Sequence, residues 1–406
     1  MGLADMTGSR LNVLLIHRFF KPDSPPYAFI LDDIRRLLVE KGMLVDVLSS
    51  QPSYKSVDKK NKLPWKVQDE SGSNIFRLPV FQFKNQKIAK LLNFVFFPLF
   101  SFCFVLLGKK YQVVSVSTAP PVVLAFFVAL ACKCRGFKLI YHCMDIHPEI
   151  GRISGEFKSK MIFKLLYAMD RLTCRTASKI IVLSEDMRAS LLRRDKNLAP
   201  KIEIINNYDL SSEGGVNHGF FDMNDGKKRV IFAGNIGRFQ NLDSFILALK
   251  NNPRLENFEL LFVGEGTALE GIKNLAAGLE EQVRFIPHQP VGVARQMISA
   301  ADIAIVSLQK EVIKFAFPSK TMTYLAEGTS ILAMVEKDSE LATFISNNSL
   351  GHVVEPGDSS GVYEVFKSLS ENDFCFDCGQ VINIFEKNFS RRQFNNKFIS
   401  LLDGLA

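Results

Sequence analysis

The sequence predicts two α/β domains in series, each built on a parallel, doubly wound sheet. The chain has 406 residues, and a domain usually takes about 100–200 residues. Short apolar runs alternate with helical patterns in both halves, which is typical of βαβ units. A polar stretch rich in Gly, Ser, Asn and Asp at 209–228 separates the two series of runs. We interpret this stretch as an interdomain linker.

The N-terminal half contains apolar runs with the length of buried strands, at 12–16, 44–50, 112–117, 138–142, 179–183 and 201–206. A helical pattern at 27–41 follows the first run and places Ile34, Leu37 and Leu38 on one face. It ends at Gly42, a common stop for a helix. We therefore expect a Rossmann-like domain over 1–208.

The C-terminal half repeats this alternation. Its strand-like runs lie at 229–234, 258–264, 283–286, 302–307 and 329–335, with helical patterns at 242–249 and 293–299 between them. We expect a second Rossmann-like domain over 229–388, with the two domains facing a cleft. The segment 389–406 is expected to form a C-terminal helix that packs back on the first domain.

The composition is basic and unusually rich in phenylalanine. The formal net charge is +8, and there are 35 Phe against 8 Tyr and 1 Trp. The hydrophobic fraction of 47% and the charged fraction of 23%, with 25 Gly and 16 Pro, exclude a disordered or low-complexity chain. A basic surface with extra apolar residues suits an anionic membrane face, although a nucleic acid or an anionic ligand could also explain the charge.

Seven cysteines do not form a disulfide framework in a chain of this length. Cys132 and Cys134, with Cys375 and Cys378, could in principle hold zinc, but no further Cys or His lies near them at finger-like spacing. We therefore predict unpaired thiols and no metal site. The first ten residues lack the apolar core of a signal peptide, which indicates a cytoplasmic protein.

An uncharged run at 91–108, LLNFVFFPLFSFCFVLLG, contains six of the phenylalanines and is bracketed by lysines. Its length just reaches that of a membrane-spanning helix, about 18 residues. Pro98 in its middle and basic residues at both ends argue against a simple span. We predict that 84–110 forms a helix pair lying in the membrane interface. A buried core helix and a true span are the alternatives.

Two loops are candidates for binding an anion. The first, GNIGRFQNL at 234–242, joins a strand to a helix, and Gly234 and Gly237 permit close backbone approach while Arg238 adds a charge suited to phosphate. The second, FPSKTMTYLAEG at 317–328, offers Ser319 as N-cap and Lys320 in the first helical turn. Ordinary packing turns and an ordinary capped helix are the alternatives.

Two further loops follow strands of the N-terminal half. HCMDIHPE at 142–149 places Asp145, His147 and Glu149 at a strand end, where open α/β sheets bind ligands. Asp145 is the candidate carboxylate for holding a hydroxyl and taking its proton, and His147 could do acid–base work. The loop at 17–26 offers the cations His17, Arg18 and Lys21, or it is simply a solvated, proline-shaped loop.

Taken in order, these motifs make the sequence resemble bacterial family-four glycosyltransferases of the GT-B fold. With FVGEG at 262–266, ADIAIVSL at 301–308 and GHVVEPGD at 351–358 they cover nearly the whole chain. The similarity is to the branch that builds O-antigen and colanic acid, including L-fucosamine transferases. The resemblance implies a C-terminal domain that binds a nucleotide sugar, an N-terminal domain that binds the acceptor, and no metal or other cofactor.

The resemblance also assigns residues. Those implied for the donor are Gly234, Asn235, Gly237, Gln240, Gly264, Glu265, Gly266, Pro318, Ser319 and Thr321; those for catalysis are Asp145, His147, Glu149, Arg238 and Lys320; those for the acceptor are His17, Arg18 and Lys21. The sequence departs from the family pattern at two places. The usual pair of glutamates would fall at Phe315 and Thr323, and the usual lysine after the glycine loop is Gln240.

The expected function is transfer of a sugar, with retention of configuration, from a UDP- or GDP-sugar to a polyprenyl-diphosphate-linked saccharide. A UDP-sugar is the preferred donor. The protein is expected at the cytoplasmic face of the inner membrane, with no nucleic acid partner, because its lysines flank an apolar run rather than forming a stripe. A nucleotide-sugar 2-epimerase of the same fold is one alternative. The missing acidic pair leaves a non-catalytic scaffold as another.

Overall fold

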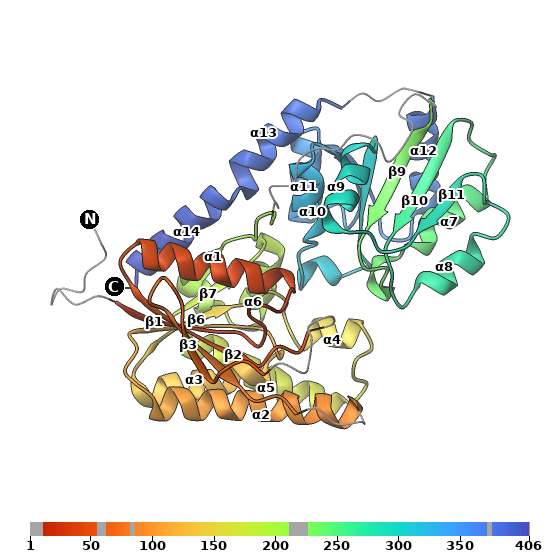
Figure 1. Cartoon of the computed structure of the whole chain (residues 1–406). Coiled ribbons are helices and arrows are strands. Elements are labelled where there is room, and N and C mark those ends of the chain that lie inside the picture. Colours follow the sequence, from red (N-terminus) through yellow and green to blue (C-terminus); the bar gives the residue numbers. More distant parts are fainter. Residues whose placement is uncertain (1–10, 55–61, 82–85, 211–225, 372–375, 406) are drawn as a thin grey trace. The chain divides into compact units, whose positions relative to one another are not determined.

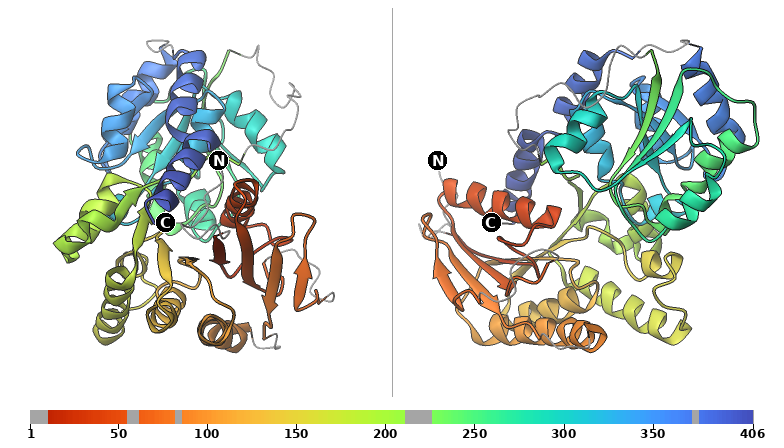
Figure 2. Two further views of the ribbon diagram at one scale, coloured as in Figure 1. Left: turned by 90° about the vertical axis from the view of Figure 1, so that its left-hand side faces the viewer. Right: turned by 45° about the vertical axis from the view of Figure 1, so that its right-hand side comes forward.

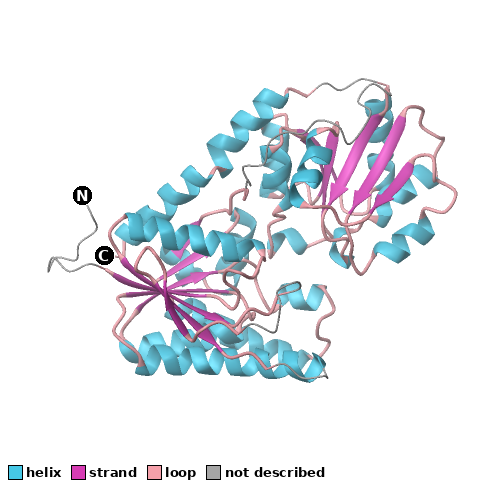
Figure 3. Ribbon diagram, viewed as in Figure 1, coloured by secondary structure: helices cyan, strands magenta, loops and turns pink. Residues whose placement is uncertain are grey.

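A computed structural model describes residues 11–54, 62–81, 86–210, 226–371 and 376–405 (Figure 1). The chain divides into two compact units, Met1–Asn206 with Phe394–Ala406 and Asn207–Gln393. Each unit has one sheet with helices packed against it, as Figure 3 shows. The prediction of two α/β domains is confirmed. Most of the expected linker, 211–225, lies outside the described residues.

The first unit contains an eight-stranded sheet in the order β3-β4-β2-β1-β5-β6-β7-β8. The strands are β1 Asn12–Ile16, β2 Leu44–Ser50, β3 Lys66–Gln68, β4 Asn74–Leu78, β5 Val113–Ser117, β6 Lys138–His142, β7 Lys179–Val182 and β8 Ile202–Ile204. All neighbours pair in parallel except β3 and β4. The sequence did not predict β3 and β4, because β3 is short and carries polar, largely exposed residues at both ends.

Helices cover both faces of this sheet. They are α1 Pro26–Glu40, α2 Gln86–Leu107, α3 Val123–Arg135, α4 Glu149–Ile153, α5 Lys160–Thr176, α6 Glu185–Arg194, the 3-10 helix η1 Lys196–Lys201, and α14 Arg391–Asp403. Figure 1 shows α2, α3 and α5 side by side on one face, with α1 on the other. The last helix, α14, belongs to the first unit (Figure 2), where Lys138 Nζ donates to the Leu405 carbonyl.

The apolar run forms one helix, α2, rather than the predicted pair of helices. The helix continues through Pro98, and its buried residues include Phe97 and Val105, because α2 packs along α3. Leu91 and Leu107 remain largely exposed. Among the described residues, no helix combines the length and the apolar character needed to cross a bilayer.

The second unit contains a six-stranded, fully parallel sheet in the order β11-β10-β9-β12-β13-β14. Its strands are β9 Lys228–Ala233, β10 Phe258–Val263, β11 Val283–Ile286, β12 Ile303–Ser307, β13 Ser330–Met334 and β14 Gly351–Val354. Its helices are η2 Arg238–Gln240, α7 Asp243–Lys250, α8 Leu269–Leu275, α9 Val291–Ser299, η3 Val312–Lys314, α10 Lys320–Ala326, α11 Glu340–Asn347, α12 Ser359–Ser370 and α13 Cys378–Phe389. The strand order reverses between β9 and β12, so the carboxyl ends of these two strands flank the place where such sheets bind ligands.

The surplus of phenylalanine has a second explanation besides α2. Phe232, Phe245, Phe258 and Phe262 are almost fully buried in the core of the second unit, and Phe366 of α12 packs on Phe258 with ring centroids 4.8 Å apart. These side chains fill the layer between the sheet and α7 and α12. Part of the aromatic excess therefore stabilises an ordinary core, where each ring buries a large apolar area.

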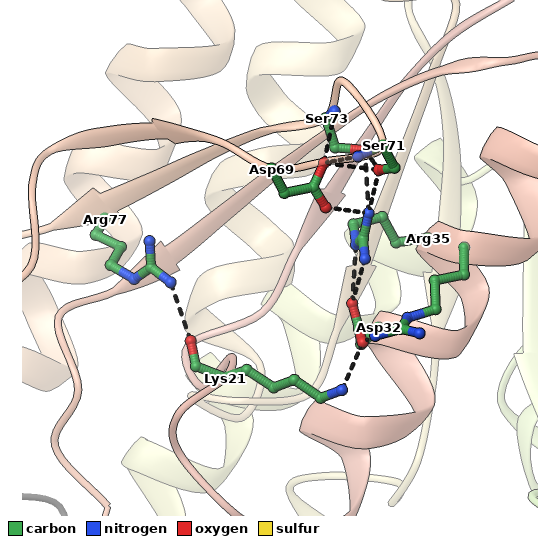
Figure 4. Close-up of polar contacts among 8 residues, drawn as sticks. Lys21, Asp32, Arg35, Asp69, Ser71, Ser73 and Arg77 are labelled. Carbon is green, nitrogen blue, oxygen red and sulfur yellow. Dashed lines mark hydrogen bonds and ion pairs between the residues drawn. The ribbon is translucent and has the colours of Figure 1, made fainter.

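A charged network fixes the loop after β1 (Figure 4). Asp32 of α1 is buried and accepts from Lys21 Nζ at 2.6 Å and from Arg35 Nε at 2.8 Å. Arg35 also pairs with Asp69 in the turn between β3 and β4, and Arg77 of β4 donates to the Lys21 carbonyl at 3.0 Å. Burial alone would raise the pKa of Asp32, but the hydrogen bonds from Lys21 and Arg35 outweigh it and hold that pKa below its usual value.

We expect Asp32→Asn to lower the free energy of unfolding by about 2–3 kcal/mol at pH 7, because the buried guanidinium of Arg35 loses one of the two carboxylates that pair with it. A lowered aspartate pKa adds stability above the usual pKa near 4, and this stability is lost as the pH falls through the folded-state value. Urea unfolding measures the difference. Glu40→Gln, an exposed carboxylate at the end of the same helix, is the control and should change little. Equal effects of the two variants would contradict this account.

Candidate functional site

The loop after β9 lies at the switch point of the second sheet, and its first residue has to be glycine. Gly234 has φ +126°, a region that side chains rarely adopt. A Cβ at this position would come 2.8 Å from Cε of Lys320. The predicted glycine loop and the predicted lysine are therefore in direct contact within one unit.

The loops after β9 and β10 pack backbone against backbone. A Cβ on Gly264 (φ +135°) would run into the Gly234 carbonyl, and one on Gly266 into the Ile236 carbonyl. Two short hydrogen bonds join the loops: Gly234 N–H donates to the Val263 carbonyl and Ile236 N–H to the Glu265 carbonyl, both at 2.8 Å. These glycines allow the two loops to pack this closely, and their contact with a donor stays a prediction. Asn235 is exposed beside them.

The turn that follows is held by its own side chains. Gln240 accepts from the Gly237 N–H through Oε1 at 2.8 Å, while its carbonyl accepts from Ser307 Oγ at the end of β12. Gln309 Nε2 donates to the Arg238 carbonyl at 2.7 Å. The Arg238 side chain is exposed and forms no ion pair with the described residues. Its guanidinium is therefore available to a ligand, whereas the amide of Gln240 is used in the turn.

Lys320 begins α10, and its ammonium lies in a partly apolar environment. Nζ is 3.4 Å from the centroid of the Phe232 ring and 3.5 Å from the Asn235 carbonyl oxygen. Burial lowers the pKa of Lys320 to about 7. No carboxylate of a described residue pairs with it. A lysine with a pKa near 7 beside a glycine loop can bind an anion, and the bound anion favours its protonated form.

The remaining predicted residues of this loop have different surroundings. Pro318 is half-buried, and Ser319 is exposed at the N-cap position, but its hydroxyl caps no described backbone N–H. Thr321 is fully buried, and its hydroxyl has no hydrogen-bond partner among the described residues. Thr321 therefore lies inside the fold rather than at its surface.

Tyr324, which the sequence analysis did not single out, fixes α10 to the end of β9. Its hydroxyl accepts from the Ala233 N–H at 3.0 Å and lies 3.2 Å from the Ala233 carbonyl. Tyr324 is 1% exposed. Lys320 lies one turn earlier on the same helix, so this contact also positions the Lys320 side chain next to Gly234. Only the fold brings Tyr324 and Ala233 together.

The position that lacks the expected acid is occupied by a different polar cluster. Thr323 Oγ1 donates to Asp209 Oδ1 at 2.9 Å, and Arg295 Nη1 lies 2.7 Å from Asp209 Oδ2. Arg295 also pairs with Glu327. A carboxylate therefore does lie beside residue 323, but it comes from the segment that leads into the second unit. Phe315, the other departure, is half-buried.

In the first unit, the loop after β6 places Asp145 and His147 near each other. Burial, with a smaller contribution from the charge of Glu156, raises the pKa of Asp145 to about 6. Burial lowers the pKa of His147 to about 4, and its Nδ1 is 3.4 Å from the Asp145 carbonyl oxygen. Asp145 is therefore ionised at neutral pH but close to titration, while His147 is neutral.

Arg194 of α6 holds this loop from below. It donates to Glu149 Oε1 at 2.9 Å and pairs with Oε2, it lies 2.5 Å from Oδ2 of Asp170, and it donates to the His147 carbonyl at 3.1 Å. Tyr141 donates to the other oxygen of Asp170 at 2.9 Å. Glu149, predicted as a catalytic carboxylate, is thus bound by a buried cation. The sequence analysis missed Arg194, which lies 45 residues from Glu149 in the chain.

The loop after β1 offers fewer open cations than its sequence predicts. His17 is 5% exposed and hydrogen-bonded to Ser117 Oγ at the end of β5; burial lowers its pKa to about 3. Lys21 is paired with Asp32. Arg18 is half-buried, and its guanidinium carbon lies 5.2 Å from the Phe19 ring centroid. Of the three, Arg18 is the cation without a carboxylate partner among the described ion pairs.

The described residues contain no group of three or more His, Cys, Asp or Glu side chains arranged to hold a metal ion. Cys132 is buried, and Cys134 and Cys378 are exposed and unpaired. Cys375 lies outside the described residues.

Several solved structures have the same fold as this chain. The chain superposes on a sucrose-phosphate synthase from Thermosynechococcus elongatus with a TM-score of 0.69 and 15% identity, covering 98% of this chain and 99% of that one. The lipopolysaccharide outer core galactosyltransferase WaaB superposes with a TM-score of 0.66 and 11% identity, covering 98% of this chain and 100% of that one. Anabaena HepE, solved in complex with UDP-glucose, superposes with a TM-score of 0.66 and 15% identity, covering 97% of this chain and 100% of that one. The fold is that of GT-B glycosyltransferases.

The sequence comparisons agree with this fold. Residues 217–380 match the model of glycosyl transferases group 1, so the chain carries a group 1 glycosyltransferase domain. Probable glycosyltransferase WbjE from Pseudomonas aeruginosa is 26% identical over 79% of this chain and 82% of its own length. The putative colanic acid biosynthesis glycosyl transferase WcaI from Escherichia coli K12 is 23% identical over 75% of this chain and 78% of its own length. The predicted family resemblance is confirmed; the narrower similarity to L-fucosamine transferases stays a prediction.

We expect Arg194→Met to lower the free energy of unfolding by about 3–5 kcal/mol, because it leaves the fully buried Asp170 without its cation. Adding Asp170→Asn and Glu149→Gln removes the stranded charges and should restore much of the loss. Arg188→Met, on the exposed side of the same helix, is the control and should stay within about 0.5 kcal/mol. Denaturant unfolding measures all four proteins. A triple variant no more stable than Arg194→Met would show that the cluster is not held by charge.

Proposed function

We propose that the chain transfers a sugar from a nucleoside-diphosphate sugar, with UDP as the preferred nucleotide, to a polyprenyl-diphosphate-linked saccharide during synthesis of a bacterial surface polysaccharide. The observation that carries the proposal is the Lys320 ammonium above the loop that begins at Gly234, at the switch point of the second sheet. The group 1 domain and the UDP-glucose bound by the neighbour HepE support it. The similarity to WcaI, a putative colanic acid biosynthesis glycosyl transferase, supports a role in polysaccharide synthesis.

In the proposed reaction, the bond between the anomeric carbon and the diphosphate oxygen breaks, and the nucleoside diphosphate leaves with the electron pair. Lys320 and the exposed Arg238 stabilise the negative charge that develops on this leaving group. The acceptor hydroxyl oxygen bonds to the anomeric carbon. Asp145 orients that hydroxyl and takes its proton. The family resemblance supports retention of configuration and a route that does not depend on a metal.

The acceptor and the place of the reaction are part of the same proposal. A polyprenyl diphosphate is held in a membrane, so the transferase has to work at its surface. We propose that the segment 84–110, which contains α2, contacts the cytoplasmic face of the inner membrane. The exposed side chains of Leu91 and Leu107 and the exposed Lys110 support this contact.

The reaction class is tested by incubating the protein with a panel of labelled UDP- and GDP-sugars, with and without a bacterial lipid extract. Transfer predicts labelled lipid only when extract is present. Formation of an epimer in its absence would identify an isomerase instead. A scaffold would produce neither product, although the same extract supports a known transferase.

The role of Asp145 predicts a pH profile. Because its pKa is raised to about 6, Asp145 gains a proton below that pH, and the transfer rate should fall about tenfold per pH unit there. Asp145→Asn should lower the rate by about 10²–10⁴-fold and leave UDP binding intact. Glu156→Gln removes the neighbouring charge, so the midpoint of the profile should move to lower pH. An unchanged midpoint in Glu156→Gln would argue against Asp145 as the titrating group.

Lys320 predicts how donor binding depends on pH. Above pH 7.5 the phosphates of UDP are fully ionised, since their last pKa is about 6. Lys320, with a pKa of about 7, loses its proton in this range, so the affinity for UDP should fall by up to about tenfold per pH unit. Lys320→Arg should bind with little pH dependence and Lys320→Met weakly at every pH. Calorimetry measures the affinities, with Lys337→Met as an exposed control. A wild-type affinity that does not change with pH would contradict the role of Lys320.

A further inference from the structure

The helix α5 exposes an apolar stripe, formed by Met161, Leu165 and Leu172, that is not contiguous in the sequence. Met161 is 78% exposed, Leu165 61% and Leu172 39%, and the spacing of four and seven residues puts all three on one side of the helix. Ile162, 45% exposed, widens the stripe at its first turn. The stripe runs from Met161 to Leu172, about 16 Å along the helix. Exposed apolar side chains scattered singly are ordinary, but a stripe of this length is not.

Basic side chains border this stripe along one side. Lys160, Lys164, Arg171 and Arg175 follow each other at spacings of four, seven and four, which places them on a neighbouring face of α5. Arg171 and Arg175 are anchored by Asp195, whereas Lys160 and Lys164 are exposed near the first turn. The single acidic residue of α5, Asp170, is fully buried. The outer surface of the helix is therefore apolar and positive, with no acidic side chain.

The same side of the first sheet carries α2. Figures 1 and 2 show α2, α3 and α5 together on this side, and α3 contacts both of the others. On α2, Leu91, Val95, Phe100 and Leu107 are exposed, and on α3 Phe126, Phe127 and Leu130 are half-buried. The apolar side chains exposed on α5 and on α2 thus belong to one layer of helices on this side of the sheet.

We propose that α5, together with α2, docks the protein on an anionic lipid surface, with the apolar stripe inserted among the acyl chains and the lysines at the phosphates. An amphipathic helix with a basic border lies in the plane of an interface rather than across it. The uniform positive charge selects an anionic surface as the occupant. This inference rests on the proposed function, because a lipid-linked acceptor requires the enzyme at a membrane, and it adds α5 to the predicted contact segment 84–110.

The test is sedimentation of the full chain with vesicles of phosphatidylglycerol and phosphatidylethanolamine, compared with vesicles of phosphatidylcholine alone. We expect binding to the anionic vesicles and much weaker binding to the neutral ones. Lys160→Gln with Lys164→Gln should weaken binding to anionic vesicles about tenfold or more. Met161→Ser with Leu165→Ser should weaken it by a similar factor. All four side chains are exposed, so these variants should keep the melting temperature of the parent.

Matched controls separate α5 from general surface effects. Val291→Ser replaces an apolar side chain that is 63% exposed in the second unit, and Lys337→Gln removes an exposed charge there. Both should bind vesicles like the parent. Equal loss in the controls and in the α5 variants would overturn the proposal. So would undiminished vesicle binding by the α5 variants, or a dimer in solution that the Met161→Ser and Leu165→Ser pair dissociates, because the stripe would then bind a second copy.

The outcome is distinguishable from failure of the proposed function. The α5 variants should bind UDP like the parent and should retain transfer to an acceptor dissolved in detergent. If they lose vesicle binding but keep both activities, the docking surface is established. If the parent binds anionic vesicles but no nucleotide sugar, the proposed reaction fails while the docking surface stands.

Discussion

The contact between the loops after β9 and β10 is the constraint on which the second unit depends. Gly234, Gly264 and Gly266 let two backbones meet where any side chain would separate them. This contact leaves room above Gly234 for the aliphatic part of Lys320, and Tyr324 fixes the helix that carries it to Ala233. The cation is therefore positioned by backbone packing and one hydroxyl rather than by a carboxylate. No carboxylate of a described residue pairs with Lys320, so under the proposed function its ammonium is available to the diphosphate of the donor.

In the first unit, buried ion pairs rather than glycines fix the loops at the strand ends. Arg194 ties together Glu149, Asp170 and the backbone of the loop that presents Asp145, while Asp32 does the same for the loop after β1. Removing one partner from either cluster leaves a buried charge without its counter-ion, so each complete cluster favours one conformation of its loop. Asp145 itself takes no part in either cluster. Burial raises the pKa of its carboxyl group, which under the proposed function keeps Asp145 ready for proton transfer.

The sequence predicted the elements that rest on local patterns. The apolar runs defined most strands, since buried parallel strands are nearly continuous in apolar residues. Gly234 was found because it directly follows a strand, and Lys320 because it lies in the first turn of a helix behind a candidate N-cap. Contacts between distant segments were missed: Tyr324 with Ala233, Asp209 with Thr323, and Arg194 with Glu149. The stripe on α5 was missed because charged residues interrupt it along the chain, and only helical geometry separates the two faces. The run in α2 was apolar on all sides, so its packing on α3 could not be told from membrane contact.

The place of Lys320 over the Phe232 ring has a consequence for the energetics of ligand uptake. At neutral pH the empty protein holds this side chain as a mixture of ammonium and neutral amine. A diphosphate beside it favours the ammonium, so under the proposed function the donor and a proton bind together. The heat of binding would then vary with the ionisation enthalpy of the buffer, and release of the nucleoside diphosphate would return the proton to solution. Donor occupancy in the cell would in this way follow the acidity of the surrounding medium.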